Sequence, residues 1–405
     1  MRPSALLRTI SAWLLLCLFL PGAAWAQTAV VPIDLHATKR TQAVFLNLQQ
    51  SIQQGKLLFG HQDDLAYGVD WREKPGASDV KAVCGDFPAV YGWELGNLEH
   101  DLPYNLDSVN FEHMKGWIKD GYRRGGVITI SWHLDNYTTG GSAWDTTAAV
   151  HKIIPGGSMH ARYKADLDRF AEFVNDLRAG GLFNRRQIPI IFRPFHELTG
   201  GWFWWGKGHT SPEDFKALWR FTVSYLRDVK GLHNILYAYN TSEHFENAVD
   251  FLRFYPGDEW ADILSFDDYG DLMSAEGELR FQKCLKTVVE TAEARHKIAA
   301  LAETGLEGIK RPDWYTTVLL KNIQADPVGK RIAYVLVWRN ANHKHHYAPY
   351  PGHPGAADFQ AFYKDDSTLF EQDLHRFYKK PKPVKAPVAH LGASMPAAQS
   401  VGTNK

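Results

Sequence analysis

The sequence predicts an α/β protein folded as one (β/α)8 barrel, and three observations support this fold class. Short apolar runs rich in β-branched residues alternate with segments of helical spacing, which indicates parallel strands joined by crossover helices. Eight such runs occur, the number of strands in a closed barrel of this kind. The chain has 405 residues, 45% of them hydrophobic, and is long enough to bury one large core. We therefore expect a single domain of the TIM-barrel type.

Each expected strand is a short apolar run whose last residues are polar or aromatic. In chain order we place the strands at residues 57–62, 89–95, 126–134, 189–197, 234–242, 261–269, 298–305 and 332–340. In such barrels the active site is built at the carboxyl ends of the strands. Carboxylates, imidazoles and indoles are dense at these ends, so the sequence predicts a functional site there.

Helical spacing fills the intervals between the strands. We expect helices at residues 163–180, 212–230, 280–296 and 314–326, with residues 359–379 as a closing helix. Ser211 precedes Pro212, Glu213 and Asp214, which places a capping residue before a proline and two acids at the positive end of a helix.

The two ends of the chain differ in composition from the expected barrel. Arg2 and Arg8, an apolar run at residues 13–20 and the stretch AWA at residues 24–26 are typical of a secretory signal peptide. We expect cleavage after Ala26, a mature domain at residues 27–380 and a secreted or periplasmic protein. Residues 381–405 are rich in Pro, Ala, Lys, Gly and Ser, which predicts a disordered tail.

Cysteine content and charge exclude several protein classes. Only Cys84 and Cys284 follow the signal peptide, so the domain is not a disulfide scaffold, and whether the two form one bridge stays open. Lys plus Arg and Asp plus Glu both number 45, so no basic excess is available to bind nucleic acid. The 14 tryptophans exceed what a core of this size usually needs, and flat apolar rings suit stacking on sugars.

Two glutamates, Glu197 and Glu303, end the fourth and seventh expected strands. Both strands are otherwise apolar, and an unpaired charge there is costly to bury. Cleavage of a glycosidic bond commonly uses one carboxyl group to protonate the leaving oxygen and a second to attack. The structural alternative is that each glutamate forms a salt bridge, with Arg193 or Arg339 as the partner.

Several motifs resemble those of glycoside hydrolase family 26, which contains many β-mannanases. The acid/base segment of that family is similar to FRPFHE at residues 192–197 followed by GWFWWG at 201–206, and its nucleophile segment is similar to AETG at 302–305. Further matches are LFGHQ at 58–62, YGWE at 91–94, SFDDY at 265–269 and VWRN at 337–340. The resemblance extends over residues 55–375.

The resemblance implies a retaining double displacement on β-1,4-mannosidic linkages, with Glu197 as acid/base and Glu303 as nucleophile. It implies substrate contacts or supporting roles for His133, His196, Trp202, Asp267, Tyr269, Trp338 and Arg339. Outer sugars are expected to reach Trp144, His353 and the loop at residues 99–104, where Asp101 is placed to block the glycone side. The expected partner is a β-mannan polysaccharide or oligosaccharide, bound by a monomer without metal or cofactor. Endo or exo action stays open.

Three alternatives compete with this interpretation. A metal-dependent hydrolase would use His61 and Asp63 with the cluster at residues 343–346, but the first strand lacks the second histidine that such sites usually have. A barrel that binds polysaccharide without cleaving it would keep the tryptophans but has no need of both glutamates. The third alternative keeps the mechanism and changes the sugar to β-1,3-xylan or mixed-linkage β-glucan.

Overall fold

A computed structural model of the protein describes residues 31–180 and 185–381. The predicted signal peptide at residues 1–26 and all but the first residue of the predicted tail lie outside the described residues, so both stay predictions. No helix in the described part of the chain is long and apolar enough to cross a membrane.

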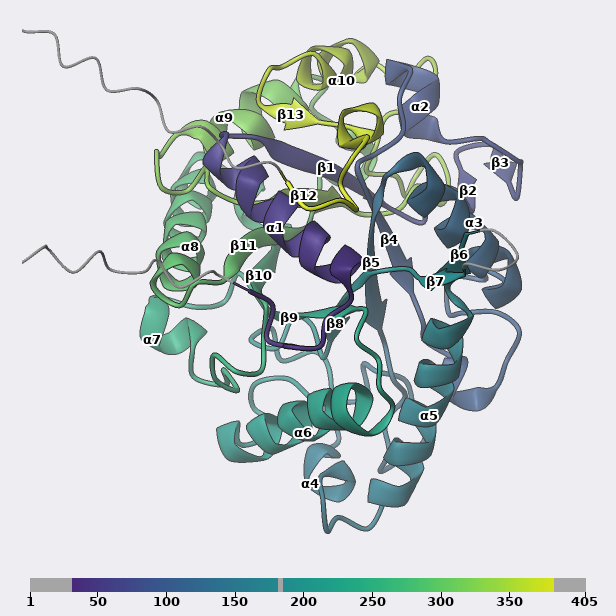
Figure 1. The fold of residues 1–405 in the computed structure, drawn as a ribbon. Coiled ribbons are helices and arrows are strands. Elements are labelled where there is room, and N and C mark those ends of the chain that lie inside the picture. The colour runs from purple at the N-terminus through teal and green to yellow at the C-terminus, as the bar shows by residue number, and fades with distance from the viewer. Residues whose placement is uncertain (1–30, 181–184, 382–405) are drawn as a thin grey trace, which may run out of the picture. The chain divides into compact units, whose positions relative to one another are not determined.

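Eight parallel strands form a closed barrel, because β12 pairs with β11 on one side and with β1 on the other (Figure 1). In chain order they are β1 (Leu57–Gln62), β4 (Val90–Glu94), β5 (Val127–Trp132), β8 (Ile190–Pro194), β9 (Ile235–Ser242), β10 (Ile263–Asp268), β11 (Ile298–Thr304) and β12 (Tyr334–Val337). All eight lie inside the predicted ranges, and the predicted fold class is confirmed. Closure leaves no unpaired edge among these strands.

Every residue of the eight barrel strands is buried. One face of each strand points into the barrel and the other packs under the surrounding helices, so both faces are covered. This is why the strands appear in the sequence as continuous apolar runs rather than as alternating polar and apolar residues.

The helices surround the barrel, as Figure 1 shows most clearly for α3, α5, α6 and α8. The described residues contain α1 (Lys39–Gln53), α2 (Asp79–Cys84), α3 (Phe111–Arg124), α4 (Val150–Ile153), α5 (His160–Asp176), α6 (Pro212–Ser224), α7 (Ala248–Phe251), α8 (Ala275–Ala294), α9 (Lys321–Gln324) and α10 (Ala356–Tyr363). Helix α1 contacts both β1 and β9, which lie across the barrel from each other. It therefore covers the amino-terminal end and leaves the carboxyl ends of the strands for a site.

The start of α6 is built as its sequence predicts. The Ser211 hydroxyl accepts a hydrogen bond from the backbone N–H of Asp214 at 3.0 Å, and Pro212 occupies the first turn. A π-helical segment, Tyr225–Val229, continues the helix to the end that the sequence predicts. The helix predicted between β11 and β12 also contains a π-helical segment, Tyr315–Leu320, which here precedes the α-helix α9.

The prediction of one closing helix at residues 359–379 is wrong. Helix α10 ends at Tyr363, and the chain then forms the short strand β13 (Thr368–Leu369), which pairs with β1, and a 3-10 turn, Glu371–Leu374. The carboxylate of Asp365 accepts a hydrogen bond from the backbone N–H of Ser367 at 2.8 Å. Such local side-chain bonds compete with helical backbone bonds, which explains the break after α10.

Within residues 31–180 and 185–381, two short antiparallel pairs lie outside the barrel. They are β2 (Tyr67–Gly68) with β3 (Trp71–Arg72), and β6 (Arg178–Ala179) with β7 (Arg186–Gln187). The question of a disulfide is also answered, because Cys84 and Cys284 are both free thiols in the structure.

Candidate active site

The carboxyl ends of the strands surround a cavity of about 330 Å³. Most of the residues predicted for the site line it together. The lining comprises His133, Trp144, His196, Glu197, Trp202, Phe203, Tyr269, Met273, Glu303, Gly305, Glu307, Trp338 and Tyr347. The rule that placed the site at the strand ends therefore identified one contiguous cavity.

Glu197 lies just beyond β8, on a turn with an unusual backbone. Phe195 has a φ of 53° and Glu197 a φ of 52°, both in the left-handed region, which costs side chains other than glycine about 1 kcal/mol or more each. The backbone N–H of Glu197 donates to Oδ1 of Asn240 on β9 at 2.9 Å. The turn is thus anchored to the neighbouring strand, and it carries the carboxyl group into the cavity.

The carboxyl group of Glu197 has one strong hydrogen bond and one unfavourable neighbour. The indole Nε1 of Trp202 donates to its Oε2 at 2.6 Å. Burial and the negative charge of Glu303 raise the pKa of Glu197 to about 7, although the Trp202 bond acts in the opposite direction. A carboxyl group with such a pKa holds its proton near neutrality and can release it to a leaving oxygen.

Glu303, the penultimate residue of β11, is held by two donors. Nη2 of Arg193 forms an ion pair with its Oε1, and the hydroxyl of Tyr269 donates to its Oε2 at 3.0 Å. Burial, followed by the charge of Glu303, raises the pKa of Tyr269 well above its usual value, so this phenol keeps the proton that it donates. The carboxylate is held on both oxygens, in an orientation suited to nucleophilic attack.

The two carboxyl groups face each other across a short gap. Oxygens of Glu197, Asp267 and Glu303 all lie within 4.8 Å of one another. Retaining glycosidases hold their two carboxyl groups about 5 to 5.5 Å apart, and inverting enzymes about 6.5 to 9.5 Å. A separation of at most 4.8 Å between these oxygens is closer to the spacing of retaining enzymes than to that of inverting ones.

Arg193 connects the nucleophile candidate to the strand beside it. It lies on β8 at 1% exposure, and its Nη1 donates to Oδ2 of Asp267 at 3.1 Å. Asp267 also accepts from Nδ2 of Asn240 at 2.9 Å. The predicted salt-bridge alternative therefore exists for Glu303, but the carboxylate also borders the cavity, so the ion pair and a chemical role are compatible.

A buried carboxylate and imidazole pair lies beside this cluster. Oε2 of Glu94, at the end of β4, lies 2.9 Å from Nδ1 of His133, and the Glu94 carboxylate is not exposed to solvent. Burial lowers the pKa of the His133 imidazole, but the charge and hydrogen bond of Glu94, together with the charges of Glu303 and Glu197, outweigh it and raise that pKa. Nε2 of His133 lies 3.2 Å from Nε2 of His196, whose pKa is lowered by burial and by His133. Two imidazoles whose pKa values are shifted in opposite directions thus share one wall of the cavity.

Aromatic rings form much of the remaining wall. Trp144, 53% exposed, stacks on His133 with ring centroids 5.1 Å apart and an angle of 12°. Trp338 follows β12 and its backbone N–H donates to the carbonyl of Thr304 at 3.2 Å, so it lies beside the end of β11. Flat, partly exposed rings at these positions offer surfaces for the apolar faces of sugars.

Four predicted residues do not line the cavity. Asp267 is buried against Arg193, and Arg339 forms an ion pair with Asp107 at 3.0 Å. Asp101 lies in a different groove, between α3 and α5, and His353 is buried with its ring centroid 5.0 Å from that of His346. The structure thus brings neither Asp101 nor His353 to the cavity.

Sequence reasoning treated Arg193 only as a possible salt-bridge partner of the two glutamates and Glu94 only as part of a matching motif, and it did not mention Tyr347. Arg193 and Glu94 carry a signal, because each is a charged residue in a buried strand and therefore needs a charged partner. Tyr347 follows the histidine-rich stretch after β12, and nothing in its sequence context indicates that its ring lies against the cavity.

The histidines of the metal-site alternative are dispersed. Nδ1 of His61 lies 2.8 Å from Asp64, Nε2 of His343 lies 2.9 Å from Asp70, and Nδ1 of His345 lies 2.7 Å from Glu307. In the described ranges, neither group of three converging ligand atoms includes any of them. The structure gives no support to a metal site built from these residues.

Comparison with known proteins agrees with the geometry. The model of glycosyl hydrolase family 26 matches residues 33–340. A mannan endo-1,4-beta-mannosidase of Bifidobacterium adolescentis is 34% identical over an alignment of 358 residues, gaps included, and the alignment covers 83% of this chain and 35% of that protein. This chain therefore spans little more than a third of that relative's length.

Solved structures give the same fold. A GH26 beta-mannanase from Bacteroides ovatus is 40% identical with a TM-score of 0.81, and the match covers 86% of this chain and 100% of that one. A modular endo-beta-1,4-mannanase from Cellulomonas fimi is 36% identical with a TM-score of 0.79, covering 89% and 81% of the two chains. With its barrel, its carboxylate pair and these matches, the chain belongs to glycosyl hydrolase family 26.

Proposed function

We propose that this chain is a retaining glycoside hydrolase that cleaves β-1,4-mannosidic linkages in mannan, glucomannan or galactomannan. The observation that carries the proposal is the short gap between Glu197 and Glu303, whose oxygens lie within 4.8 Å of each other. The opposite environments of the two carboxyl groups support it further. The choice of mannan is supported by the relatives, which are named as mannanases.

The two carboxyl groups divide the reaction between them. Glu197 donates its proton to the glycosidic oxygen while Glu303 attacks the anomeric carbon and forms a covalent glycosyl ester. The ester carries no charge, so one of the causes that raise the pKa of Glu197 disappears. Glu197 then takes a proton from water, which attacks the ester and frees Glu303.

The surrounding side chains have supporting roles in this proposal. Tyr269 orients Glu303, and Trp202 holds Glu197 and lines the point of cleavage. Trp338 is the platform for the sugar under attack, and His133 and His196 line the same cavity. Asp267 and Arg339 act on the glycone side. Because neither residue lines the cavity, each would contact substrate only at the edge of the cavity.

The test is hydrolysis of four polysaccharides, mannan, glucomannan, β-1,3-xylan and mixed-linkage β-glucan, by wild type and by Glu303→Gln. We expect reducing ends from mannan and glucomannan with wild type, and a loss of about 10⁴-fold or more with the variant, because the nucleophile is gone. Release from xylan or glucan alone would keep the mechanism and change the substrate. Equal release by the variant would reject the mechanism in favour of a binding barrel.

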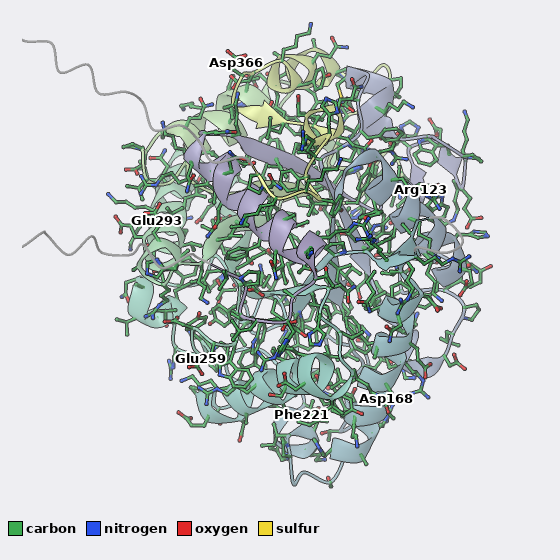
Figure 2. The ribbon with its side chains drawn as sticks, viewed as in Figure 1. Arg123, Asp168, Phe221, Glu259, Glu293 and Asp366 are labelled. Carbon is green, nitrogen blue, oxygen red and sulfur yellow. The ribbon has the colours of Figure 1, made fainter. Side chains whose placement is uncertain are left out.

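A glutamate outside the site supplies the matched control. Glu293 on α8 lies on the outer surface of the molecule, where it is labelled in Figure 2, and it pairs with Arg331 at 2.6 Å. Glu293→Gln removes the same charge by the same chemistry, and we expect it to keep wild-type activity.

The early products also distinguish the mode of action, because a spread of oligosaccharides indicates endo cleavage and mannobiose alone indicates exo cleavage.

Export through the predicted signal peptide remains part of the proposal. It is supported by the basic and apolar residues at positions 1–26. Expression with the natural leader and mass determination of the released protein test it. A mature chain that begins at Gln27 is the expected result, and retention of the full-length chain in the cytoplasm would contradict it.

A further inference from the structure

Tyr347, on the loop that follows β12, lies against the phenol that holds Glu303. It is only 9% exposed and lines the cavity. Its ring centroid lies 5.9 Å from that of Tyr269, with an angle of 73° between the rings, which is a favourable edge-to-face contact. Among the described residues, no other aromatic ring pairs with Tyr269. The position of the Tyr269 ring therefore depends on Tyr347 more than on any other ring.

The backbone of Tyr347 is held on both sides. Its N–H donates to Oδ1 of Asn340 at 2.9 Å, and its carbonyl accepts from the hydroxyl of Tyr315 at 2.6 Å. Asn340 is itself fixed, since its Nδ2 donates to the carbonyl of Ala348 at 2.8 Å and to Asp79 at 2.9 Å. A loop without regular structure thus presents one ring in a defined position.

The nucleophile strand is shaped to receive this ring. Gly305 lies two residues after Glu303 and has a φ of 147°. A Cβ atom at this position would lie 2.4 Å from Cδ1 of Tyr347 and 3.2 Å from its Cγ, which no side chain tolerates without displacement. The absence of a side chain at Gly305 therefore lets the Tyr347 ring lie directly on the strand end.

The two donors to Glu303 differ in how firmly they are held. Arg193 is buried at 1% exposure and tied to Asp267, so its position is set by the barrel core. Tyr269 follows the end of β10 and is only partly buried at the cavity wall. A phenol at that wall needs a neighbour to keep its hydroxyl 3.0 Å from Oε2 of Glu303.

We propose that Tyr347 is a positioning residue, which holds the ring of Tyr269 so that its phenol stays on the Glu303 carboxylate, and that Gly305 makes room for it. The inference rests on the proposed role of Glu303 as nucleophile. A displacement of about 1 Å at a reacting group lowers the rate by up to about 100-fold, so the effect falls on kcat rather than on substrate binding.

A double-mutant cycle tests the inference with Tyr347→Ala, Tyr269→Phe and the combination, measured on a soluble mannan or mannooligosaccharide. We expect Tyr347→Ala to lower kcat about 10- to 100-fold with KM changed by less than about threefold. In the Tyr269→Phe background the same substitution should lower kcat by less than about threefold, because the hydroxyl that Tyr347 positions is already absent. Tyr347→Phe keeps the ring and should restore most of kcat.

Two further variants control for disturbance of the loop or the strand. Tyr350→Ala shortens a ring of the same loop that packs on His343, His346 and His353 instead of Tyr269, and we expect it to keep kcat. Gly305→Ala leaves Tyr347 intact, displaces its ring and strains the backbone at the end of β11, so its loss of kcat should be at least as large as that of Tyr347→Ala. If Tyr347→Ala does not fold, Tyr347→Leu and Gly305→Ala complete the same cycle.

The outcomes separate this inference from the proposed function. Fully additive losses in the cycle would overturn it, since a residue that acts through Tyr269 has no effect to add once the phenol is gone. A loss in Tyr347→Phe equal to that in Tyr347→Ala would also overturn it, because the hydroxyl rather than the ring would then matter. In either case an inactive Glu303→Gln would leave the proposed function standing.

Discussion

The ends of β8 and β11 carry the same side chain, glutamate, in opposite surroundings. At the end of β11, Glu303 meets a buried guanidinium and a phenol, which together bind both of its carboxylate oxygens. Beyond β8, Glu197 meets one neutral indole and the negative charge of Glu303, and its pKa rises to about 7. The chemical difference between the two glutamates therefore arises from their neighbours and not from the strands that carry them.

The comparison also shows how the charges are arranged. The guanidinium of Arg193 forms ion pairs with Glu303 and Asp267. It forms no ion pair with Glu197, and its charge lowers the pKa of Glu197 less than the Trp202 hydrogen bond does. One cation thus binds the nucleophile candidate, while burial and the charge of Glu303 raise the pKa of the facing acid. If this distribution determines the division of roles, changes on the two sides should have different consequences.

The largest effect is expected from removal of the cation. Arg193→Met leaves Asp267 and Glu303 without their buried partner, and breaking such a pair costs about 3 to 5 kcal/mol of unfolding free energy. Urea denaturation measures the loss. Arg331→Met, which breaks an ion pair of comparable geometry between partly exposed groups, should cost less than about 1 kcal/mol. Equal losses in the two variants would show that the buried pair has no special role.

A smaller effect is expected from the residue that links the two sides. Asn240→Ala removes the acceptor for the Glu197 backbone N–H and a donor to Asp267. Because buried polar groups are then left unpaired, the free energy of unfolding should fall by about 1 to 3 kcal/mol. The substitution should also lower kcat, because the strained turn that carries Glu197 loses its anchor. Asn322→Ala removes an equally buried amide on α9, which bonds to Glu278, Gln282 and Val318 and does not line the cavity, and it should destabilise without loss of kcat. Unchanged kcat in Asn240→Ala would show that the turn carrying Glu197 keeps its conformation without the hydrogen bond to Asn240.

The smallest effect concerns pH and the Glu197 side alone. Activity should fall as pH rises through about 7, because Glu197 loses the proton that it must donate. The Trp202 hydrogen bond lowers this pKa, so Trp202→Phe should move the alkaline limb of kcat/KM upward by up to about one pH unit, which corresponds to about 1.4 kcal/mol. The kcat/KM profile of the two proteins between pH 4 and pH 9 gives the shift.

Another indole supplies the control for the pH experiment. Nε1 of Trp71 donates to a carboxylate oxygen of Asp79 at 2.7 Å, outside the cavity. Trp71→Phe removes a bond of the same kind and should leave the alkaline limb in place. A downward shift in Trp202→Phe, or the same shift in both variants, would contradict the assignment of that limb to Glu197.

Local sequence features predicted the strands and most of the cavity, since each depends on neighbouring residues. The run IIFRPFHE combines a buried strand with polar residues at its end, and AETG does the same on the other side of the barrel. The helix start at Ser211 was equally local, because its cap involves only the next three residues. The prediction of a closing helix was wrong for two reasons. Asp365 forms a local turn after α10, and β13 pairs with β1, which lies far away in the sequence.

The sequence by itself determined the fold class, the two glutamates and the face of the barrel on which they lie, because strand periodicity and strand ends are encoded along the chain. Only the tertiary structure decided which of them is held by a cation, how near they lie to each other and which rings support them. Arg193 lies 110 residues from Glu303 in the chain, and Tyr347 reaches Tyr269 from a loop of no regular pattern. Such contacts depend on barrel closure, which sets distances that no local pattern contains.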